Sequence, residues 1–378
     1  MEFLSSKDKI KFFALALKNL SAIVGYNKLS PPITMWRMTK RCNLKCKHCS
    51  HHLNRDKIES EKLLSVANKI AKSDTMVVLI TGGEPLMIPN FREIIRILKA
   101  SGKIIMINTN GYLLMEYADF LIENAIDYIA ISFDGHNAET HDRIRGKIGS
   151  FDKAMEAIEY IKKNRQEKTP YLLVRGVTMR DNFETTSSYV DVFKEKVDEI
   201  KFQPVHDYEG YDEVVDKNVL FENNAVEIEK EFEHSFGELF KKHSEFDTYY
   251  YQKFQKFIFN PKSMETESLN HCLPIWFIFF CILEDGTCKT CTQNIGDIYQ
   301  DEINDIWNNK KRLDFLTALS HQGKCNAPCW MTCTSAAQGW QGRLIKNVLK
   351  TAPLDKGYLR EFEASPNYLG GKQAEIEF

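Results

Sequence analysis

Along residues 31–206, two spacings of apolar side chains alternate. Short apolar runs of strand length are followed by segments whose apolar residues recur every three to four positions, as on one face of a helix. Continuous apolar runs are typical of strands that are covered on both faces. The predicted strands are Ile33–Met38, Met76–Ile80, Ile104–Ile107, Tyr128–Phe133, Tyr171–Val177 and Ile200–Val205. The predicted helices between them are Glu59–Ser73, Phe91–Ala100, Met115–Asn124, Phe151–Asn164 and Phe183–Lys196.

This alternation predicts an α/β fold. Repeated strand–helix units imply a parallel sheet with helices outside it, joined by right-handed crossovers. Six strands, where a complete barrel has eight, favour a partial barrel that is open on one side. The pattern alone also permits a doubly wound sheet. In either case we expect the chemistry at the carboxyl ends of the strands.

Three further segments flank these repeats. Residues 1–30 contain one amphipathic helix, which we expect to pack across the open bottom of the barrel in preference to a membrane surface. Residues 207–265 are acidic and rich in aromatic side chains, and they are predicted to be a helical linker that covers the substrate side. Residues 341–378 hold two prolines and a Gly-Gly pair, and they are predicted to be a loose tail.

The bulk composition excludes several classes of function. The chain has 378 residues, a net charge of −2 and 43% hydrophobic residues, so a full core can be buried and no basic stripe indicates nucleic-acid binding. No apolar run is long enough to span a bilayer, and the layout of a secretion signal is missing. We therefore expect a cytoplasmic protein, in which ten cysteines indicate metal or redox chemistry and not disulfides.

The cysteines fall into two groups. Cys42, Cys46 and Cys49 have the spacing CxxxCxxC, and the other seven lie between residues 272 and 333. A 4Fe–4S cluster normally takes four cysteines, so three would leave one iron open to another ligand. A disulfide cannot use three cysteines, and a structural zinc site requires a fourth ligand. From this motif alone, a zinc site and buried thiols stay open as alternatives.

The first group resembles the signature of the radical S-adenosylmethionine (SAM) superfamily. One strand later, the run Thr-Gly-Gly-Glu-Pro at residues 81–85 resembles the GGE motif of that family. The resemblance implies a partial (β/α)6 TIM-like barrel and a 4Fe–4S cluster whose open iron is chelated by the amino and carboxyl groups of SAM. It also implies that reduction of the cluster releases a 5′-deoxyadenosyl radical, which abstracts a hydrogen atom from the substrate.

The resemblance assigns roles to residues near the strand ends. Glu84 would hold the amino group of SAM, and Arg145, in a stretch similar to the HDxxRG of SPASM-type members, would balance its carboxylate. An ordinary surface arginine is the alternative for Arg145, and a turn-stabilising role is the alternative for Asn108. His48 would stack on the adenine ring. The expected SAM-binding residues are His48, Gly82, Gly83, Glu84, Asn108, Ser132, Asp134, Arg145 and Gln203.

The second group resembles the opening of a SPASM/Twitch auxiliary-cluster domain, which we expect over residues 266–340. A cysteine, a hairpin with a turn at Gly286, and the pattern GxxxxC carry this resemblance. No cysteine follows Cys333, which favours the Twitch form with one auxiliary cluster. Zinc or a second auxiliary cluster are the alternatives, and Cys281 and Cys288 are expected to be core thiols. The auxiliary ligands are expected to be four of Cys272, Cys291, Cys325, Cys329 and Cys333.

Together these resemblances imply an enzyme that cleaves SAM reductively in order to oxidise or cross-link a peptide or a small molecule. A carbon-skeleton or transfer enzyme that uses SAM as co-substrate is one alternative, and a non-catalytic iron–sulfur or zinc protein is another. The expected partners are a one-electron donor such as flavodoxin or ferredoxin and the peptide or small-molecule substrate.

A catalytic base is hard to assign from the sequence. Sulfatase-maturating members have an aspartate directly after the GxxxxC cysteine, whereas this chain has Thr292, which puts that reaction in doubt. His206, Asp207 and Tyr208, at the end of the sixth predicted strand, are weak candidates for the base.

Overall fold

The computed structural model describes residues 30–54, 57, 59–205, 214–221, 225–246, 279–290 and 293–315. The strands are β1 (Ile33–Arg37), β2 (Val77–Thr81), β3 (Ile104–Thr109), β4 (Tyr128–Ser132), β5 (Tyr171–Thr178), β6 (Glu199–Pro204), β7 (Phe279–Ile282), β8 (Thr287–Thr290) and β9 (Gln293–Asp297). The α-helices are α2 (Ser60–Lys72), α3 (Phe91–Ala100), α4 (Leu114–Glu123), α5 (Ala138–Arg145), α6 (Ser150–Asn164), α7 (Thr186–Phe193), α8 (Ala225–Lys242) and α12 (Ile303–Trp307). Short 3₁₀ helices are η1 (His51–Leu53), η2 (Pro85–Met87), η3 (Phe183–Thr185), η4 (Lys217–Val219) and η5 (Ser244–Phe246).

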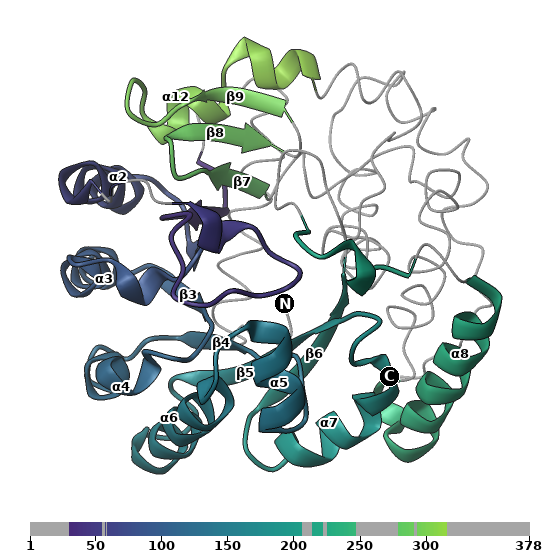
Figure 1. Ribbon diagram of the computed structural model, residues 1–378. Coiled ribbons are helices and arrows are strands. Elements are labelled where there is room, and N and C mark those ends of the chain that lie inside the picture. Colours follow the sequence, from purple (N-terminus) through teal and green to yellow (C-terminus); the bar gives the residue numbers. More distant parts are fainter. Residues whose placement is uncertain are drawn as a thin grey trace, which may run out of the picture.

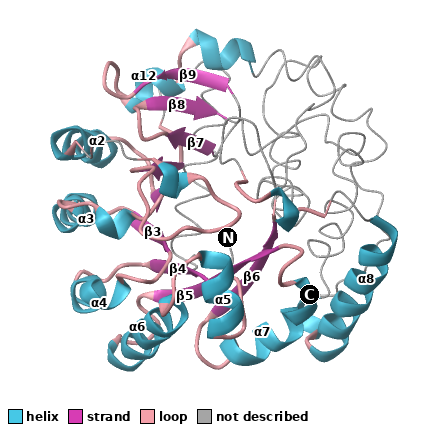
Figure 2. Ribbon diagram, in the orientation of Figure 1, coloured by secondary structure: helices cyan, strands magenta, loops and turns pink. Residues whose placement is uncertain are grey.

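One nine-stranded sheet organises these elements, in the order β6-β5-β4-β3-β2-β1-β7-β8-β9. Strands β1 to β6 pair in parallel with their neighbours in the sequence. Helices α2, α3, α4, α6 and α7 lie along the outside of the curved sheet (Figure 1), and the strands line the inside of this arc (Figure 2). This arrangement is an open (β/α)6 barrel, which confirms the predicted fold class.

The two faces of the sheet bury different amounts of apolar surface. Toward the helices, alternate strand residues join one large core. The inner face carries two small clusters, one of Val77 with Ile104 and one of Met106, Ala130 and Leu173. Strands that are covered on both faces have no water to bind, so their backbone N–H and C=O groups pair with neighbouring strands. Continuous apolar runs are typical of such buried parallel strands. The core members contributed by β2, β3 and β4 are Val78, Ile80, Ile105, Ile107, Ile129 and Ile131.

The observed bounds follow the predictions closely, with two differences. The helix predicted over Phe183–Lys196 begins with the 3₁₀ turn η3 and ends as α7 at Phe193. Helix α5 was not predicted, because it has only eight residues and two of its three buried side chains are those of His141 and Arg145. It is capped by Asn137, whose side chain accepts a hydrogen bond from the backbone N–H of Thr140 at 2.9 Å.

Strands β7 to β9 extend the same sheet beyond β1. β7 pairs in parallel with β1, Ile33 lying opposite Phe279, and β8 and β9 follow in antiparallel pairing. The expected hairpin is thereby confirmed, and its turn requires glycine, because Gly286 has a φ of +89° and a Cβ atom there would lie 2.3 Å from the ring of Tyr299. The separate small domain expected over residues 266–340 stays a prediction.

The helix expected in residues 1–30 lies outside the described residues, apart from Ser30, and so do the tail and much of the linker. Within the linker, the described helix α8 agrees with its expected helical character. None of the helices that the structure describes is long and apolar enough to cross a membrane.

Candidate functional site

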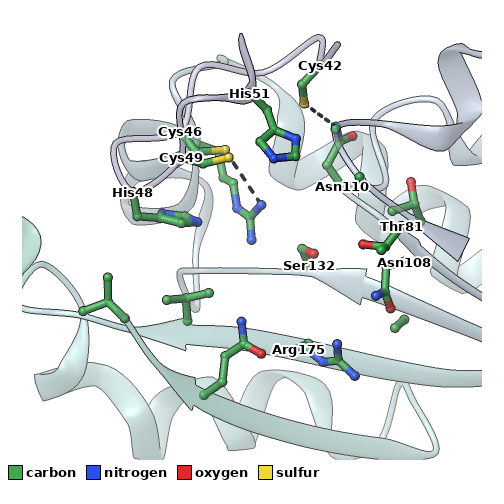
Figure 3. A pocket seen from close by; sticks show the side chains of 18 of the residues that line it. Cys42, Cys46, His48, Cys49, His51, Thr81, Asn108, Asn110, Ser132 and Arg175 are labelled. Atoms are coloured by element: carbon green, nitrogen blue, oxygen red, sulfur yellow. Dashed lines mark hydrogen bonds between the residues drawn. The ribbon is translucent and has the colours of Figure 1, made fainter. Parts of the chain in front are cut away.

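A cavity of about 300 Å³ lies at the carboxyl ends of β2 to β6, under the loop that follows β1. Figure 3 shows the three loop cysteines and His51 on one side of it and side chains from the strand ends on the other. The residues predicted from sequence that line it are Cys42, Cys46, His48, Cys49, Gly82, Gly83, Asn108, Ser132, Arg145 and Gln203. Glu84 and Asp134 are buried next to this lining and are not part of it.

The loop with the three cysteines is held on one side by the turn after β2. The backbone N–H of Gly83 donates to the carbonyl oxygen of Thr39 at 2.6 Å, and that of Glu84 donates to Arg41 at 2.9 Å. A Cβ atom at Gly83 would lie 2.0 Å from the carbonyl oxygen of Arg41, and one at Gly82 would lie 2.4 Å from that of Thr39. The two glycines, expected from sequence to bind SAM, let the cysteine loop approach the turn closely.

Helix α5 holds the other side of the same loop. The backbone N–H groups of Lys45 and Lys47 donate to the carbonyl oxygens of Arg145 and Ile144, at 3.1 and 3.0 Å. These oxygens belong to the last turn of α5, which has no partners for them within the helix. The loop and the helix end therefore satisfy each other, and this fixes the cysteines relative to β4.

The sulfur atoms of the loop cysteines are partly shielded from solvent. Cys46 is 7% exposed, and burial raises the pKa of the Cys46 thiol and raises that of Cys42 to about 12. The side-chain amide of Asn110 lies 3.7 Å from the Cys42 sulfur, and the Arg145 guanidinium lies 3.8 Å from the Cys46 sulfur. Each contact places a donor on a sulfur atom and so favours its thiolate form.

These residues fit a cluster better than a single metal ion. Among the described residues, no three cysteine, histidine or carboxylate side chains converge as ligands of one ion. A cluster does not need such convergence, because each cysteine binds a different iron. Close by, the side-chain oxygen of Asn108 is buried in the cavity wall and accepts no hydrogen bond within the described part of the chain, so it offers an acceptor to a polar ligand.

Asp134 and Arg145 form a buried ion pair behind the cysteine loop. The Oδ2 atom of Asp134 lies 2.6 Å from Nε of Arg145 and 3.7 Å from Nε2 of His48. Its Oδ1 atom accepts the backbone N–H of Val177 at 2.9 Å. Burial alone would raise the pKa of Asp134, but the Arg145 guanidinium, followed by His48, holds it below its usual value. The carboxylate therefore orients Arg145 toward Cys46.

The carboxylate of Glu84 is fully buried beneath the turn after β3. It accepts hydrogen bonds from Thr109 and the backbone N–H of Asn110, both at 2.8 Å, and from the backbone N–H of Leu86 at 3.1 Å. Burial raises the pKa of Glu84 to about 7 in spite of these donors. In this position the side chain fixes Asn110, which contacts Cys42, and its expected contact with a SAM amino group stays a prediction.

A second ion-pair network joins the cavity to the β7–β8 turn. Arg37 lies 3.2 Å from Nε2 of His51 through its Nη2 atom and 3.4 Å from Glu284 through its Nε atom. Lys40 binds the other oxygen of Glu284 at 3.0 Å. Because arginine can only donate, Nε2 of His51 is the acceptor, and the neutral ring carries its proton on Nδ1. Arg37 thus connects the hairpin to a residue that lines the cavity.

Several lining residues were not predicted. Thr81 and Arg175 face the cavity from β2 and β5, and His51 does so from η1. Thr81 is the last residue of its strand, and strand ends are where parallel folds place their sites, so position alone would have indicated it. Nothing in the sequence indicated His51, because its position depends on a contact with Arg37, the last residue of β1.

Several residues predicted from sequence lie outside the described residues. They are the base candidates His206, Asp207 and Tyr208, the position Thr292, and the expected auxiliary ligands Cys272, Cys291, Cys325, Cys329 and Cys333. Cys281 and Cys288 are described, and both are fully buried and free of disulfides. Cys288 packs within the large apolar core, as expected for a core thiol.

Comparison with known proteins gives matches over the same region. Residues 36–187 match the sequence model of the family described as the radical SAM superfamily. The chain is 29% identical to Fe-coproporphyrin III synthase of Methanosarcina barkeri over 194 residues, which is 50% of this chain and 47% of that protein. It is 35% identical to mycofactocin maturase MftC of Mycolicibacterium smegmatis over 136 residues, which is 35% of this chain and 34% of that one.

Among solved structures, SuiB of Streptococcus suis has a similar fold. Its complex with S-adenosylmethionine gives a TM-score of 0.55 at 14% identity and covers 78% of this chain and 69% of that chain. Its complex with the precursor peptide SuiA gives a TM-score of 0.57 at 14% identity. The chain spans less than half the length of the two sequence relatives named above.

Proposed function

We propose, from the match of residues 36–187 to the radical SAM family model, that this protein is an enzyme that cleaves SAM reductively and abstracts a hydrogen atom from its substrate. The observation that carries the proposal is the joint position of Cys42, Cys46 and Cys49 on one cavity at the carboxyl ends of the strands. A zinc or scaffold function would not require the polar strand ends to face the same space.

Each residue then has a defined task. Cys42, Cys46 and Cys49 would hold a 4Fe–4S cluster, and this cluster with SAM on its open iron would supply the electron transfer and the radical. Asn110 and Arg145 would donate to the cluster sulfur ligands from opposite sides.

The other lining residues would bind SAM itself. Asn108, Ser132 and Gln203 face the cavity and would hold its polar groups, and His48 would lie against the adenine. The main role of Glu84 would be to fix the turn that carries Asn110, because its oxygens already accept three hydrogen bonds. One acceptor position remains on Oε2, which accepts a single bond, and an ammonium contact by Glu84 would use it.

We infer that the substrate is a peptide that becomes oxidised or cross-linked. The maturase named above and the SuiB complex with its precursor peptide support this class. A tetrapyrrole is the second candidate, because the match to Fe-coproporphyrin III synthase covers a larger part of the chain. The expected SPASM/Twitch domain with one auxiliary cluster belongs to the same proposal, and it would receive the electron from the substrate radical.

The direct test uses protein reconstituted with iron and sulfide in the absence of oxygen. With SAM and dithionite we expect 5′-deoxyadenosine by mass spectrometry, and none without dithionite. No 5′-deoxyadenosine from a fully loaded protein would contradict the proposal. Iron analysis then tests the auxiliary site: about four irons per chain indicate one cluster and about eight indicate two.

A further inference from the structure

We propose that the surface formed by Lys45, Tyr112, Lys147, Ile148 and Lys153, here called the Tyr112 face, is the docking site of an acidic one-electron carrier protein. The proposal rests on the proposed function, because it concerns how the electron reaches the cluster. It adds to that function a specific entry face and the charge of the partner.

Positive charge gathers at this face although the chain as a whole has a net charge of −2. Residues 40–47 of the cysteine loop contain four basic residues and no acidic one. Across from them, the ammonium groups of Lys147 and Lys153 lie 5.0 and 4.2 Å from the centre of the Tyr112 ring. Two ammonium groups held over one aromatic ring repel each other, so an approaching carboxylate would be attracted to both.

Two other basic residues nearby share one carboxylate, which offsets one of their two positive charges. Asp181 binds Lys47 at 2.8 Å and Arg143 at 2.7 Å. Asp152 adds one exposed carboxylate beside Lys153. The proposal therefore depends on Lys45, Lys147 and Lys153 alone.

An exposed apolar side chain stands among these lysines. Ile148 is 93% exposed, more than any other large apolar side chain among the described residues. It follows the turn at Gly146, where a Cβ atom would lie 2.3 Å from the carbonyl oxygen of Lys45, so the turn packs directly against the cysteine loop. One exposed apolar side chain next to Lys147 in the sequence suits a small, transient interface of the kind that redox partners form.

The Tyr112 face lies directly outside the wall that carries two of the cysteines. The backbone N–H of Tyr112 donates to Oδ1 of Asn110 at 2.9 Å, and the amide nitrogen of Asn110 lies 3.7 Å from the Cys42 sulfur. On the other side, Lys45 binds the backbone of Arg145, whose guanidinium contacts Cys46. Two short hydrogen-bonded paths thus run from the face to cysteine sulfur atoms.

The inner side of this wall faces the cavity in which we place SAM and the substrate. While SAM occupies the cavity, this wall offers a protein donor a route to the cluster from outside. In the step itself the carrier loses one electron and the oxidised cluster gains it, and no bond is formed or broken.

The test compares a protein reductant with a small one on the full-length, reconstituted protein. Reduced flavodoxin, which is acidic, and dithionite are each mixed with the protein without SAM, and the rate of cluster reduction is followed by visible absorbance and by the EPR signal of the reduced cluster. We expect the Lys147→Glu/Lys153→Glu variant to react about tenfold or more slowly with flavodoxin and within twofold of wild type with dithionite. Added salt should slow wild type with flavodoxin more than it slows the variant.

A matched control reverses two exposed lysines at the opposite end of the barrel, Lys72→Glu/Lys163→Glu, and should leave both rates unchanged. If the glutamate pair fails to take up a cluster, Lys147→Gln/Lys153→Gln must still lower the flavodoxin rate selectively. An unchanged flavodoxin rate overturns the proposal and is the result expected if the lysines bind an acidic peptide substrate instead. Equal losses with both reductants also overturn it. Either result is distinct from failure of the proposed function, which would be absence of 5′-deoxyadenosine from wild type with dithionite.

Discussion

Two cysteine-bearing regions adjoin β1, and they differ in what surrounds their thiols. The loop after β1 directs Cys42 and Cys46 to a polar cavity, where Asn110 and Arg145 donate toward their sulfur atoms. In the hairpin beside β1, Cys288 is packed among apolar side chains, and its sulfur contacts only its own turn, at 3.6 Å from the carbonyl oxygen of Gly286, among the contacts described. Under the proposed function, donors and an adjacent cavity distinguish a ligand cysteine from a core thiol, whereas cysteine density does not.

The sharpest way to break this comparison is to remove one thiol from each region. Cys46→Ala should lose the SAM-site cluster and all 5′-deoxyadenosine formation, because two thiolates cannot hold the cluster. Cys288→Ala should keep both and lose about 1 kcal/mol of unfolding free energy, since it removes one buried sulfur atom. Iron content, product analysis and denaturant titration measure these effects. Loss of SAM cleavage in Cys288→Ala would contradict the distinction.

The next largest effect should come from the ion pair behind the loop. Asp134→Asn leaves Arg145 buried without its carboxylate, so we expect the free energy of unfolding to fall by about 3–5 kcal/mol. Arg143→Gln breaks the ion pair to Asp181, in which Arg143 is 49% exposed, and should cost less than about 1 kcal/mol. Urea denaturation of both variants measures the two losses of unfolding free energy. Similar losses would show that Asp134 does not hold the cysteine loop in place.

The helix that supports the loop should also respond to acid. His141 is fully buried in α5, and burial, together with Arg145, lowers its pKa to about 3 from the usual 6.5. The unfolded chain therefore binds a proton that the folded chain does not between these pH values. Stability is full above pH 6.5 and is lost as the pH falls toward 3, by up to about 1.4 kcal/mol per pH unit. His141→Gln should show a shallower pH dependence in denaturant titrations, and an unchanged slope would assign the effect to other groups.

The smallest predicted effect concerns the link between the two regions. Glu284→Gln weakens the contacts of the hairpin turn with Arg37 and Lys40, and we expect a loss of about 1 kcal/mol because the site is partly buried. The iron content of the SAM site should not change. Glu238→Gln, which removes an exposed pair with Lys241 at 3.8 Å, serves as the control and should have no measurable effect.

Much of the barrel was predictable because its signals are local. The apolar runs and helical periods depend on neighbouring residues, so the six strands and most helices were assigned from sequence with bounds close to those observed. The cysteine spacing and the Gly-Gly-Glu run were equally local, and both lie at the cavity. These local motifs thus predicted which segments meet at the cavity.

What escaped prediction depends on contacts between distant segments. Nothing near Gly83 indicates that it packs on Arg41, and nothing near Asp134 indicates that it is buried against Arg145. The place of His51 beside Arg37 and the pairing of β1 with β7 are of the same kind. The sequence therefore predicted which residues gather at the site better than it predicted what each of them touches.

The pairing of β1 with β7 has a consequence for how the protein is made. Ile33 lies opposite Phe279, so one edge of β1 cannot be paired by β7 until the ribosome has added the whole barrel and linker. At typical rates of synthesis this delay is on the order of ten to fifty seconds. During it β1 presents an unpaired edge that can join a neighbouring chain, and it therefore needs shielding. The same delay leaves Lys40 of the cysteine loop without Glu284, its partner in the hairpin turn.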